Sequence, residues 1–214
     1  MTKTILIIGM GPGLSLGVAE KFGAEGYAVG MISRNAAKLE GFRQQLTQKG
    51  ITAAYAPADV ADTSQMLEAI DTVQSTLGPI SVLHYNAVDY RMKPLLEETV
   101  DDLTTGFRIS VANAFAAVKA LLPDLKATGG SVLLTGGGSG NYPNPDMATI
   151  SLGKAGIRNL ALQLNQALAS QGIYVGTLTI SGWITSESPT HSPTILAEKF
   201  WELHTNRDVP ELVY

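Results

Sequence analysis

The sequence contains no cysteine, and it has only three histidines among 214 residues. The lack of cysteine excludes disulfide bonds, thiol nucleophiles and cysteine-bound zinc. The three histidines, His84, His191 and His204, stand too far apart to show the spacing of metal ligands. The sequence therefore predicts no metal site.

Charge is also scarce, with 16% charged residues and a net charge of −4. No basic patch favours nucleic acid, and no polybasic segment favours an anionic membrane. No apolar run reaches the length of a transmembrane helix. The apolar start TILIIGMG is too short for a signal peptide and has no small-residue cleavage site. We expect a cytoplasmic protein with neither a nucleic acid nor a membrane partner.

Apolar runs of strand length alternate with longer segments of helical period. The predicted strands are 4–9, 28–33, 52–59, 80–87, 130–136, 173–180 and the final ELVY, and the predicted helices are 14–26, 35–50, 61–78, 95–122, 147–171 and 193–205. Strands separated by crossover helices indicate a parallel sheet. We predict one Rossmann-type α/β domain over 1–214: a doubly wound parallel sheet of about six to seven strands with helices on both faces. Residues 181–214 form a short substrate cover and the C-terminal strand.

A glycine-rich run, GMGPGLSLG at 9–17, follows the first predicted strand and opens the first helix. Glycines allow the backbone to approach a pyrophosphate, and a helix N-terminus presents free N–H groups to it. Because a strand precedes the run and a helix follows it, the segment predicts a dinucleotide site.

The end of the second predicted strand, Ser33-Arg34-Asn35, has no acidic side chain. An acidic residue here would bond the ribose 2′-hydroxyl and favour NAD. Arg34 can instead pair with a 2′-phosphate, and Lys38 lies one turn later. The pattern favours NADP(H) over NAD(H); the alternative is that Arg34 only caps a surface turn.

From these motifs the chain resembles the short-chain dehydrogenase/reductase family along nearly its whole length. The matching positions are Gly9 and Gly13 with Ser15 in place of the third motif glycine, Asp59-Val60, Asn86-Ala87-Val88, Lys154-Ala155-Gly156, Ser181-Gly182 and Thr185. Gly11 lies in the same loop and is also expected to contact the cofactor. The resemblance implies a cofactor site at these residues, in which Ser15 could offer its hydroxyl to phosphate. It also implies an oxidoreductase that acts on a small carbonyl or alcohol.

The resemblance implies a catalytic set of tyrosine, lysine, serine and asparagine, and this chain departs from it. The tyrosine position is Ile150, the serine position is Gly137 and the asparagine position is Ser110. Only Lys154 remains, and its expected role is to hold the nicotinamide ribose. Tyr142, Ser139 and His191 are candidate substitute proton donors; each has a structural alternative as pocket lining, turn residue or exposed histidine.

Two hypotheses follow from the sequence. The first is an NADP-dependent oxidoreductase with a non-standard active site, and the second is a catalytically inactive NADP-binding sensor or scaffold of the same fold. The resemblance further implies a homodimer or homotetramer that associates through the helices at about 103–122 and 147–171.

Overall fold

The computed structural model describes residues 3–214 and contains seven strands in this range. These strands are β1 (Thr4–Ile8), β2 (Ala28–Ser33), β3 (Ala53–Pro57), β4 (Val82–Tyr85), β5 (Ser131–Thr135), β6 (Tyr174–Thr179) and β7 (Glu211–Val213). The longer helices are α1 (Leu14–Ala24), α2 (Ala36–Gln48), α3 (Thr63–Leu77), α4 (Val100–Phe107), α5 (Asn113–Thr128), α6 (Ala148–Leu168) and α7 (Pro193–Asn206). Short helical turns are η1 (Leu95–Glu97), η3 (Gly138–Gly140), η4 (Pro145–Met147) and η5 (Ala169–Gln171), and η2 (Arg108–Ala112) is a π-helix.

All seven strands are parallel and lie in the order β3-β2-β1-β4-β5-β6-β7. The predicted doubly wound parallel sheet is therefore confirmed. The chain moves outward in one direction from β1 to β3 and then crosses to β4 on the other side. Ligands bind in such sheets at the C-terminal ends of the strands where this direction reverses.

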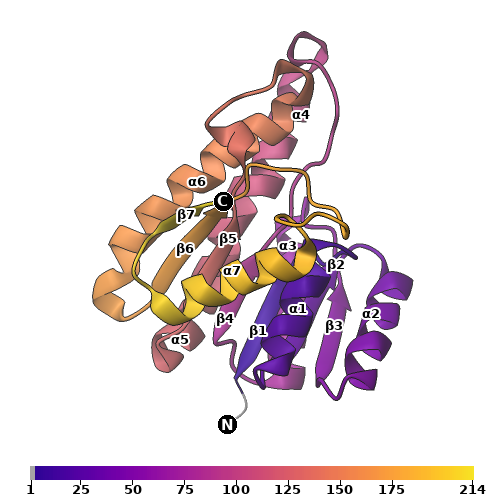
Figure 1. Ribbon diagram of the computed structural model, residues 1–214, viewed down its shortest axis with the longest axis vertical. Helices are drawn as coiled ribbons and strands as arrows, with labels where there is room; N and C mark the ends of the chain where they lie inside the picture. The colour runs from indigo at the N-terminus through magenta and orange to yellow at the C-terminus, as the bar shows by residue number, and fades with distance from the viewer. Residues whose placement is uncertain (1–2) are drawn as a thin grey trace.

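Helices cover both faces of the sheet (Figure 1). Helices α1, α2 and α7 bury one apolar layer, which includes Phe22, Leu39 and Phe200. Helices α3, α5 and α6 bury the other, which includes Ile70 and Ile157. The strands are buried on both sides, and this explains their continuous apolar runs.

The expected helix at 95–122 is divided and extended in the structure. Helix α4 passes through the π-helix η2 into α5, which continues beyond Pro123 to Thr128 instead of ending at the proline. Proline removes one helical hydrogen bond, but Pro123 is exposed, so water can reach the freed carbonyl. The π-helix adds a residue to one turn, a feature often found at functional sites.

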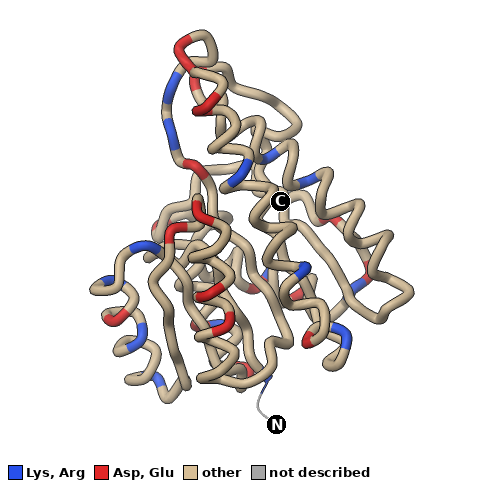
Figure 2. The backbone as a smooth tube through the Cα atoms, turned by 180° about the vertical axis from the view of Figure 1, so that it is seen from behind, with Lys and Arg blue, Asp and Glu red and all other residues tan. Residues whose placement is uncertain are grey.

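The segment between β4 and α4 projects from the molecule beside the sheet's C-terminal edge. In this segment the basic residues Arg91 and Lys93 come together, and the acidic residues Glu97 and Glu98 follow them (Figure 2). Residues 3–214 contain no helix long and apolar enough to cross a membrane.

Candidate functional site

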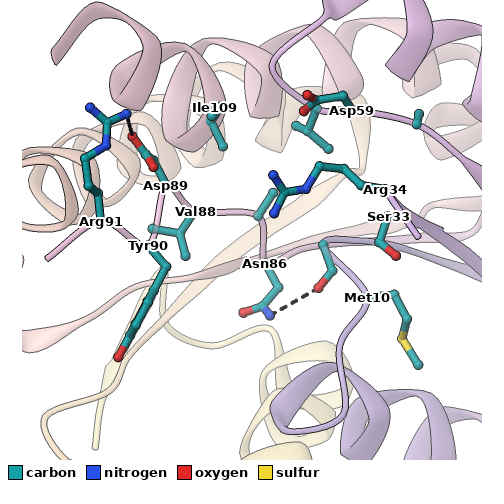
Figure 3. A pocket seen from close by; sticks show the side chains of 14 residues that line it. Met10, Ser33, Arg34, Asp59, Asn86, Val88, Asp89, Tyr90, Arg91 and Ile109 are labelled. Atoms are coloured by element: carbon teal, nitrogen blue, oxygen red, sulfur yellow. Dashed lines mark hydrogen bonds and ion pairs between the residues drawn. The ribbon is translucent and has the colours of Figure 1, made fainter. Parts of the chain in front are cut away.

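A cavity of about 500 Å³ opens at the C-terminal ends of β1, β2, β3 and β4 (Figure 3). This is the point where the strand order reverses, and it is the expected ligand position in such sheets. Eight residues predicted to bind the cofactor line the cavity: Gly9, Ser33, Arg34, Asp59, Val60, Asn86, Ala87 and Val88. The fold thus gathers motif residues from four separate stretches of sequence.

Six further lining residues were not predicted from the sequence: Met10, Ala58, Asp89, Tyr90, Arg91 and Ile109. Asp89, Tyr90 and Arg91 directly follow the Asn86-Ala87-Val88 motif, so adjacency was the signal that could have found them. Ile109 reaches the cavity from η2, and nothing in its residue type pointed there.

Gly9 allows two loops of this site to come together. Its φ is +91°, and a Cβ at this position would lie 2.5 Å from the backbone nitrogen of Ala87. The backbone N–H groups of Gly9 and Met10 both donate to the carbonyl of Ile32. A side chain at residue 9 would therefore separate the glycine-rich loop from the end of β4.

Gly11 and Gly13 leave open space above the same loop, since a Cβ at either would meet no atom within 4 Å. Helix α1 starts after Gly13 with no side-chain cap and no acidic residue in its first turn. Its N-terminus therefore keeps free N–H groups and the positive end of the helix dipole, which favour an anion.

Ser15 faces away from this open space and joins the two loops. Its hydroxyl donates to the Gly9 carbonyl at 2.9 Å and accepts from Nδ2 of Asn86 at 2.8 Å. The sequence predicts that Ser15 offers its hydroxyl to phosphate, whereas in this structure the hydroxyl proton bonds the Gly9 carbonyl. Ser15 instead fixes the glycine-rich loop against the end of β4.

The other end of the cavity lies between Arg34 and Asp59, with the Arg34 side chain extending across it (Figure 3). Arg34 forms no side-chain hydrogen bond or ion pair within residues 3–214, and its cationic group is free to meet an anion. The Asp59 carboxylate accepts from the backbone N–H of Ala61 at 3.0 Å. Lys38 lies outside the cavity lining; its backbone N–H donates to the Asn35 side chain that caps α2.

The wall formed after β4 is held by a group of ion pairs. Arg91 pairs with Asp89 at 2.7 Å, with Glu98 at 3.3 Å and with Asp102. Lys93 pairs with Asp102 at 2.9 Å, and its hydrogen bond is the main reason that the pKa of that carboxyl is lowered. The Glu98 side chain is fully buried. These contacts tie the projecting segment to the start of α4.

Lys154 lies outside this cavity lining, at the end of β5. Its Nζ donates to the carbonyl of Thr135 at 2.8 Å, and its stem passes 3.2–3.3 Å from the position of a Cβ on Gly137. Burial lowers the pKa of the Lys154 ammonium to about 8. Ile150, one helical turn earlier, is only 5% exposed and carries no group that exchanges protons.

The π-helix η2 brings Ser110 towards α6. The Ser110 hydroxyl is buried, lies 2.8 Å from a Cβ position on Gly153, and has no hydrogen-bond partner. The neighbouring carbonyl of Ile109 accepts from the Tyr85 hydroxyl at 2.5 Å. Burial raises the pKa of Tyr85, so this phenol stays protonated and serves as a structural donor.

His84 lies in the middle of β4, fully buried, with its ring edge-on to Phe200 at 4.6 Å. Neither ring nitrogen has a hydrogen-bond partner. Burial, helped by the charge of Lys154, lowers the pKa of His84 to about 3. This imidazole is therefore neutral near pH 7.

The candidate substitute donors lie in three different environments. Tyr142 is 82% exposed on the loop before α6. Ser139 lies beside an apolar hollow formed by Leu95, the loop after β5 and one face of α6. His191 packs against Gly182, and its Nδ1 is 2.8 Å from the Thr190 hydroxyl. The structure does not bring these three side chains together.

Gly182 and Thr185 belong to the loop after β6 and lie outside the cavity lining. His191 approaches the Cα side of Gly182 closely, with its Nε2 2.7 Å from a Cβ position there. The same ring contacts Tyr214 at a centroid distance of 5.3 Å. Within the part of the chain that the structure describes, no group of histidine and carboxylate side chains could hold a metal ion.

Comparison with known proteins gives matches along most of the chain. A family model described as short chain dehydrogenase matches residues 3–190. A 3-dehydrosphinganine reductase of Arabidopsis thaliana is 30% identical over 181 residues, which is 82% of this chain. The chain spans about half the length of that relative, since the match covers 54% of it.

Two solved structures show the same fold. A blue fluorescent protein from a metagenomic library, solved in complex with NADPH, is 22% identical with a TM-score of 0.88, and the match covers 99% of this chain and 95% of that one. An NADPH-bound short-chain oxidoreductase of Pseudomonas aeruginosa PAO1 is described as containing an atypical catalytic center. It is 20% identical with a TM-score of 0.87, over 98% of this chain and 94% of that one.

Proposed function

Because the chain belongs to the short-chain dehydrogenase family, we propose that it is an NADP(H)-dependent oxidoreductase that interconverts a small carbonyl and an alcohol. Its active site would be non-standard, with Ile150 at the tyrosine position. The observation that carries the proposal is the cavity at the switch point, which joins the glycine-rich loop, Arg34 and the Asn86 segment.

The residues present fit a dinucleotide. At Gly9 a Cβ would clash with the backbone of Ala87, so only glycine fits there. Gly11 and Gly13 leave open space, and they precede the N-terminus of α1, which has no side-chain cap. These groups would hold the pyrophosphate, since both the N–H groups and the helix dipole favour anions. Asp59 and Val60 would border the adenine, and Lys154 would lie on the nicotinamide side at the end of β5.

Arg34 supports the choice of NADP(H) over NAD(H). Its guanidinium extends across the cavity without an acidic partner, and β2 ends in Ser33 with no carboxylate. A 2′-phosphate would give Arg34 a charge-assisted, bidentate hydrogen bond. Lys38 is one helical turn away and would add attraction over a longer distance.

When bound, the reduced nicotinamide supplies a hydride to the substrate carbon. The chain must then orient the substrate and deliver a proton to its oxygen. Ile150 offers no proton, and Gly137 offers no hydroxyl, so the step depends on a group elsewhere in the site. The segment 181–192, with the exposed Trp183, is proposed as the substrate cover.

The test is a pair of fluorescence titrations with NADPH and NADH, followed by an assay of aldehydes and ketones. We expect NADPH to bind more tightly, and Arg34→Ala to remove most of the difference while leaving NADH binding unchanged. A charge-assisted hydrogen bond contributes about 1.5–3 kcal/mol, which corresponds to roughly a 10- to 150-fold change in affinity. Equal affinities in the unaltered protein would refute the NADP assignment.

A second candidate function is an NADP-binding sensor or scaffold without catalysis. It is favoured by the simultaneous presence of Ile150, Gly137 and Ser110 at three positions that the family resemblance assigns to catalysis. Tight NADPH binding with no oxidation of NADPH by any carbonyl compound would support this function and exclude the first.

The exposed faces of α4, α5 and α6 support a homodimer or homotetramer. Phe107, Phe115 and Leu152 are each about half exposed on these helices, which is unusual for large apolar side chains on a surface that stays free. Light scattering should give a mass of two or four chains, and Phe107→Glu together with Leu152→Glu should reduce it to one.

A further inference from the structure

Lys154 holds a partly buried cation that has few hydrogen-bond partners. An ammonium group has three N–H donors, and the structure gives Lys154 one partner, the Thr135 carbonyl at 2.8 Å. No carboxylate within residues 3–214 forms an ion pair with it. Two of its three N–H donors therefore have no protein partner in this range.

Gly137 is what gives this lysine its position. A Cβ at residue 137 would lie 3.2–3.3 Å from the methylene groups of Lys154. The lysine side chain therefore packs closely over Gly137. Ile150, one turn before it on α6, cannot donate or accept a hydrogen bond. Neither Gly137 nor Ile150 therefore supplies a proton donor beside Lys154.

We propose that Lys154 donates the proton to the substrate carbonyl oxygen, in addition to any contact it makes with the cofactor ribose. The proposal rests on the oxidoreductase function proposed above. In carbonyl reduction an Nζ–H bond breaks and an O–H bond forms on the substrate. The amine is left neutral and regains a proton from water, while the hydride from reduced nicotinamide supplies the electron pair. In alcohol oxidation, the neutral amine accepts the proton.

The electrostatic surroundings support this role. The charged and titratable side chains on the elements packed against α6 are Asp101 and Asp102 of α4, Arg108 of η2, Asp146 of η4 and Tyr174 of β6. Asp102 is engaged with Arg91 and Lys93, and Arg158 of α6 itself pairs with Glu211. His84 of β4 is close enough for the Lys154 charge to affect it, and its own burial keeps it neutral.

Burial without a counter-ion destabilises the ammonium form, which lowers the pKa of Lys154 to about 8. A proton donor works best when its pKa lies near the working pH, and lysines lowered to about 7–8 serve in this way. Tyr142 is largely exposed, and the Nε2 of His191 faces Gly182 without a partner, so neither is placed as well.

The first experiment compares Lys154→Arg with the unaltered protein and with Lys126→Arg, an exposed control on α5. Arginine keeps the positive charge and the hydrogen-bond donors but does not release a proton near neutral pH. We expect Lys154→Arg to bind NADPH but to lose about 10²- to 10⁴-fold in kcat with 4-nitrobenzaldehyde or ethyl acetoacetate as the probe. Lys126→Arg should match the unaltered protein in both measurements.

The second experiment measures the proton directly. Protein labelled with 13C at lysine Cε is titrated by NMR with and without NADPH, and the Lys154 signal is identified by its loss in Lys154→Arg. We expect this signal to titrate well below the other lysines. In the unaltered protein, kcat for carbonyl reduction should fall as pH rises through the same midpoint, because the donor must be protonated.

Three results would overturn the proposal. The Lys154 signal could titrate at the same pH as the surface lysines. The pH dependence of kcat could show no change at the Lys154 midpoint, or Lys154→Arg could retain full kcat. Each of these leaves the oxidoreductase function intact if the unaltered protein turns over a carbonyl. If the unaltered protein binds NADPH but reduces neither probe nor a wider panel of carbonyl compounds, the oxidoreductase function fails, and the proton-donor role fails with it.

Discussion

The two ends of the candidate site differ in how their buried polar groups are satisfied. At the β1–β4 end, Ser15 and Asn86 bond each other, and Asp59 accepts from the backbone. At the α6 end, the hydroxyls of Ser110, Thr135 and Thr149 and both ring nitrogens of His84 are buried without partners. An unpaired buried polar group costs about 1–3 kcal/mol, so such a concentration in one place is a substantial cost.

The difference shows which end of the site satisfies its own buried polar groups and which end does not. The first end is held together by its own hydrogen bonds and needs only an anionic ligand. The second end has unpaired hydrogen-bonding groups beside Lys154. Gly137 and Ile150, however, carry no polar side chain that could bond to them. Changes at the first end should therefore break binding, and changes at the second should alter chemistry or stability without preventing binding.

The largest effect is expected at Gly9, where glycine is required for two reasons. Gly9→Ala would place a Cβ 2.5 Å from the Ala87 nitrogen and would also force alanine to a φ of +91°. The positive φ alone costs about 1–2 kcal/mol, and the clash with backbone adds to it. We expect Gly9→Ala to lose about 3 kcal/mol or more in urea unfolding and to abolish NADPH binding.

Gly26→Ala is the matched control for this change. Gly26 has a similar φ of +88°, but a Cβ there would meet no atom within 4 Å. Gly26→Ala should lower the free energy of unfolding only by the cost of this strain, about 1–2 kcal/mol, and the variant should keep its affinity for NADPH. Equal losses of stability and binding in the two variants would show that the close approach of the two loops is unimportant.

The next effect concerns the α6 end, where a phenol can be restored. Ile150→Tyr places a hydroxyl one helical turn from Lys154, whose positive charge favours the phenolate. If the cofactor end is intact, kcat/KM for carbonyl reduction should rise by about 10- to 100-fold, part of the contribution of a positioned acid. Steady-state assays with 4-nitrobenzaldehyde measure this change.

Ile150→Phe is the control, because it adds a ring of nearly the same size without the hydroxyl. Ile150 is buried, so either aromatic variant must displace neighbours, and both should lose some stability from overpacking. A gain in the tyrosine variant alone assigns the effect to proton transfer. A gain in both would assign it to the shape of the site.

A smaller effect is expected from His84, the unpartnered imidazole beside Lys154. Its pKa is about 3 in the fold and near 6.5 in the unfolded chain, so the unfolded state binds more protons between these values. Its contribution to stability is therefore present above pH 6.5 and is lost as pH falls through this range, at up to about 1.4 kcal/mol per pH unit. Urea unfolding at pH 7.5, 6.0 and 5.0 measures the slope.

His84→Leu should make this slope shallower and should be neutral or stabilising at pH 7.5, because it removes two unpaired nitrogens. His204→Phe provides the contrast. His204 also has a pKa lowered by burial, to about 4, but its ring bonds the hydroxyls of Tyr27 and Ser131. Its loss leaves the Tyr27 hydroxyl unpaired and the Ser131 hydroxyl with only its contact to Arg207, and it should destabilise the fold. Equal losses of stability in His84→Leu and His204→Phe would contradict the distinction between a buried histidine with hydrogen-bond partners and one without.

The sequence predicted the sheet well because its signals are local. Runs such as ILII at β1 are apolar on both faces, and the glycine-rich loop marks the strand-to-helix turn that carries the site. The sequence did not predict that α5 would continue through Pro123 or that a π-helix would bring Ile109 to the cavity. Both depend on tertiary packing and solvent exposure, which periodicity does not report.

The same limit explains the site residues that were missed or given another contact. Arg91 lines the cavity because ion pairs to Asp89 and Asp102 hold its loop, and no motif encodes those distances. Ser15 was identified by its place in the motif, yet its hydroxyl turned out to bond Asn86, 71 residues away in sequence. Motif position indicates that a residue is near the ligand, whereas contact with it depends on the direction of the side chain.

The smallest effect is expected from Ser15 itself. Ser15→Ala removes the bond between the glycine-rich loop and Asn86 and leaves the Asn86 amide with a weak contact of 3.5 Å to the Gly9 carbonyl. If Ser15 only positions the loop, NADPH affinity should fall by roughly fivefold, which is about 1 kcal/mol, and NADH affinity should fall by the same factor. Ser15→Gly serves as the control for size. A loss confined to NADPH would contradict the positioning role, because Ser15 bonds Gly9 and Asn86 and not Arg34, and so has no reason to distinguish the two cofactors.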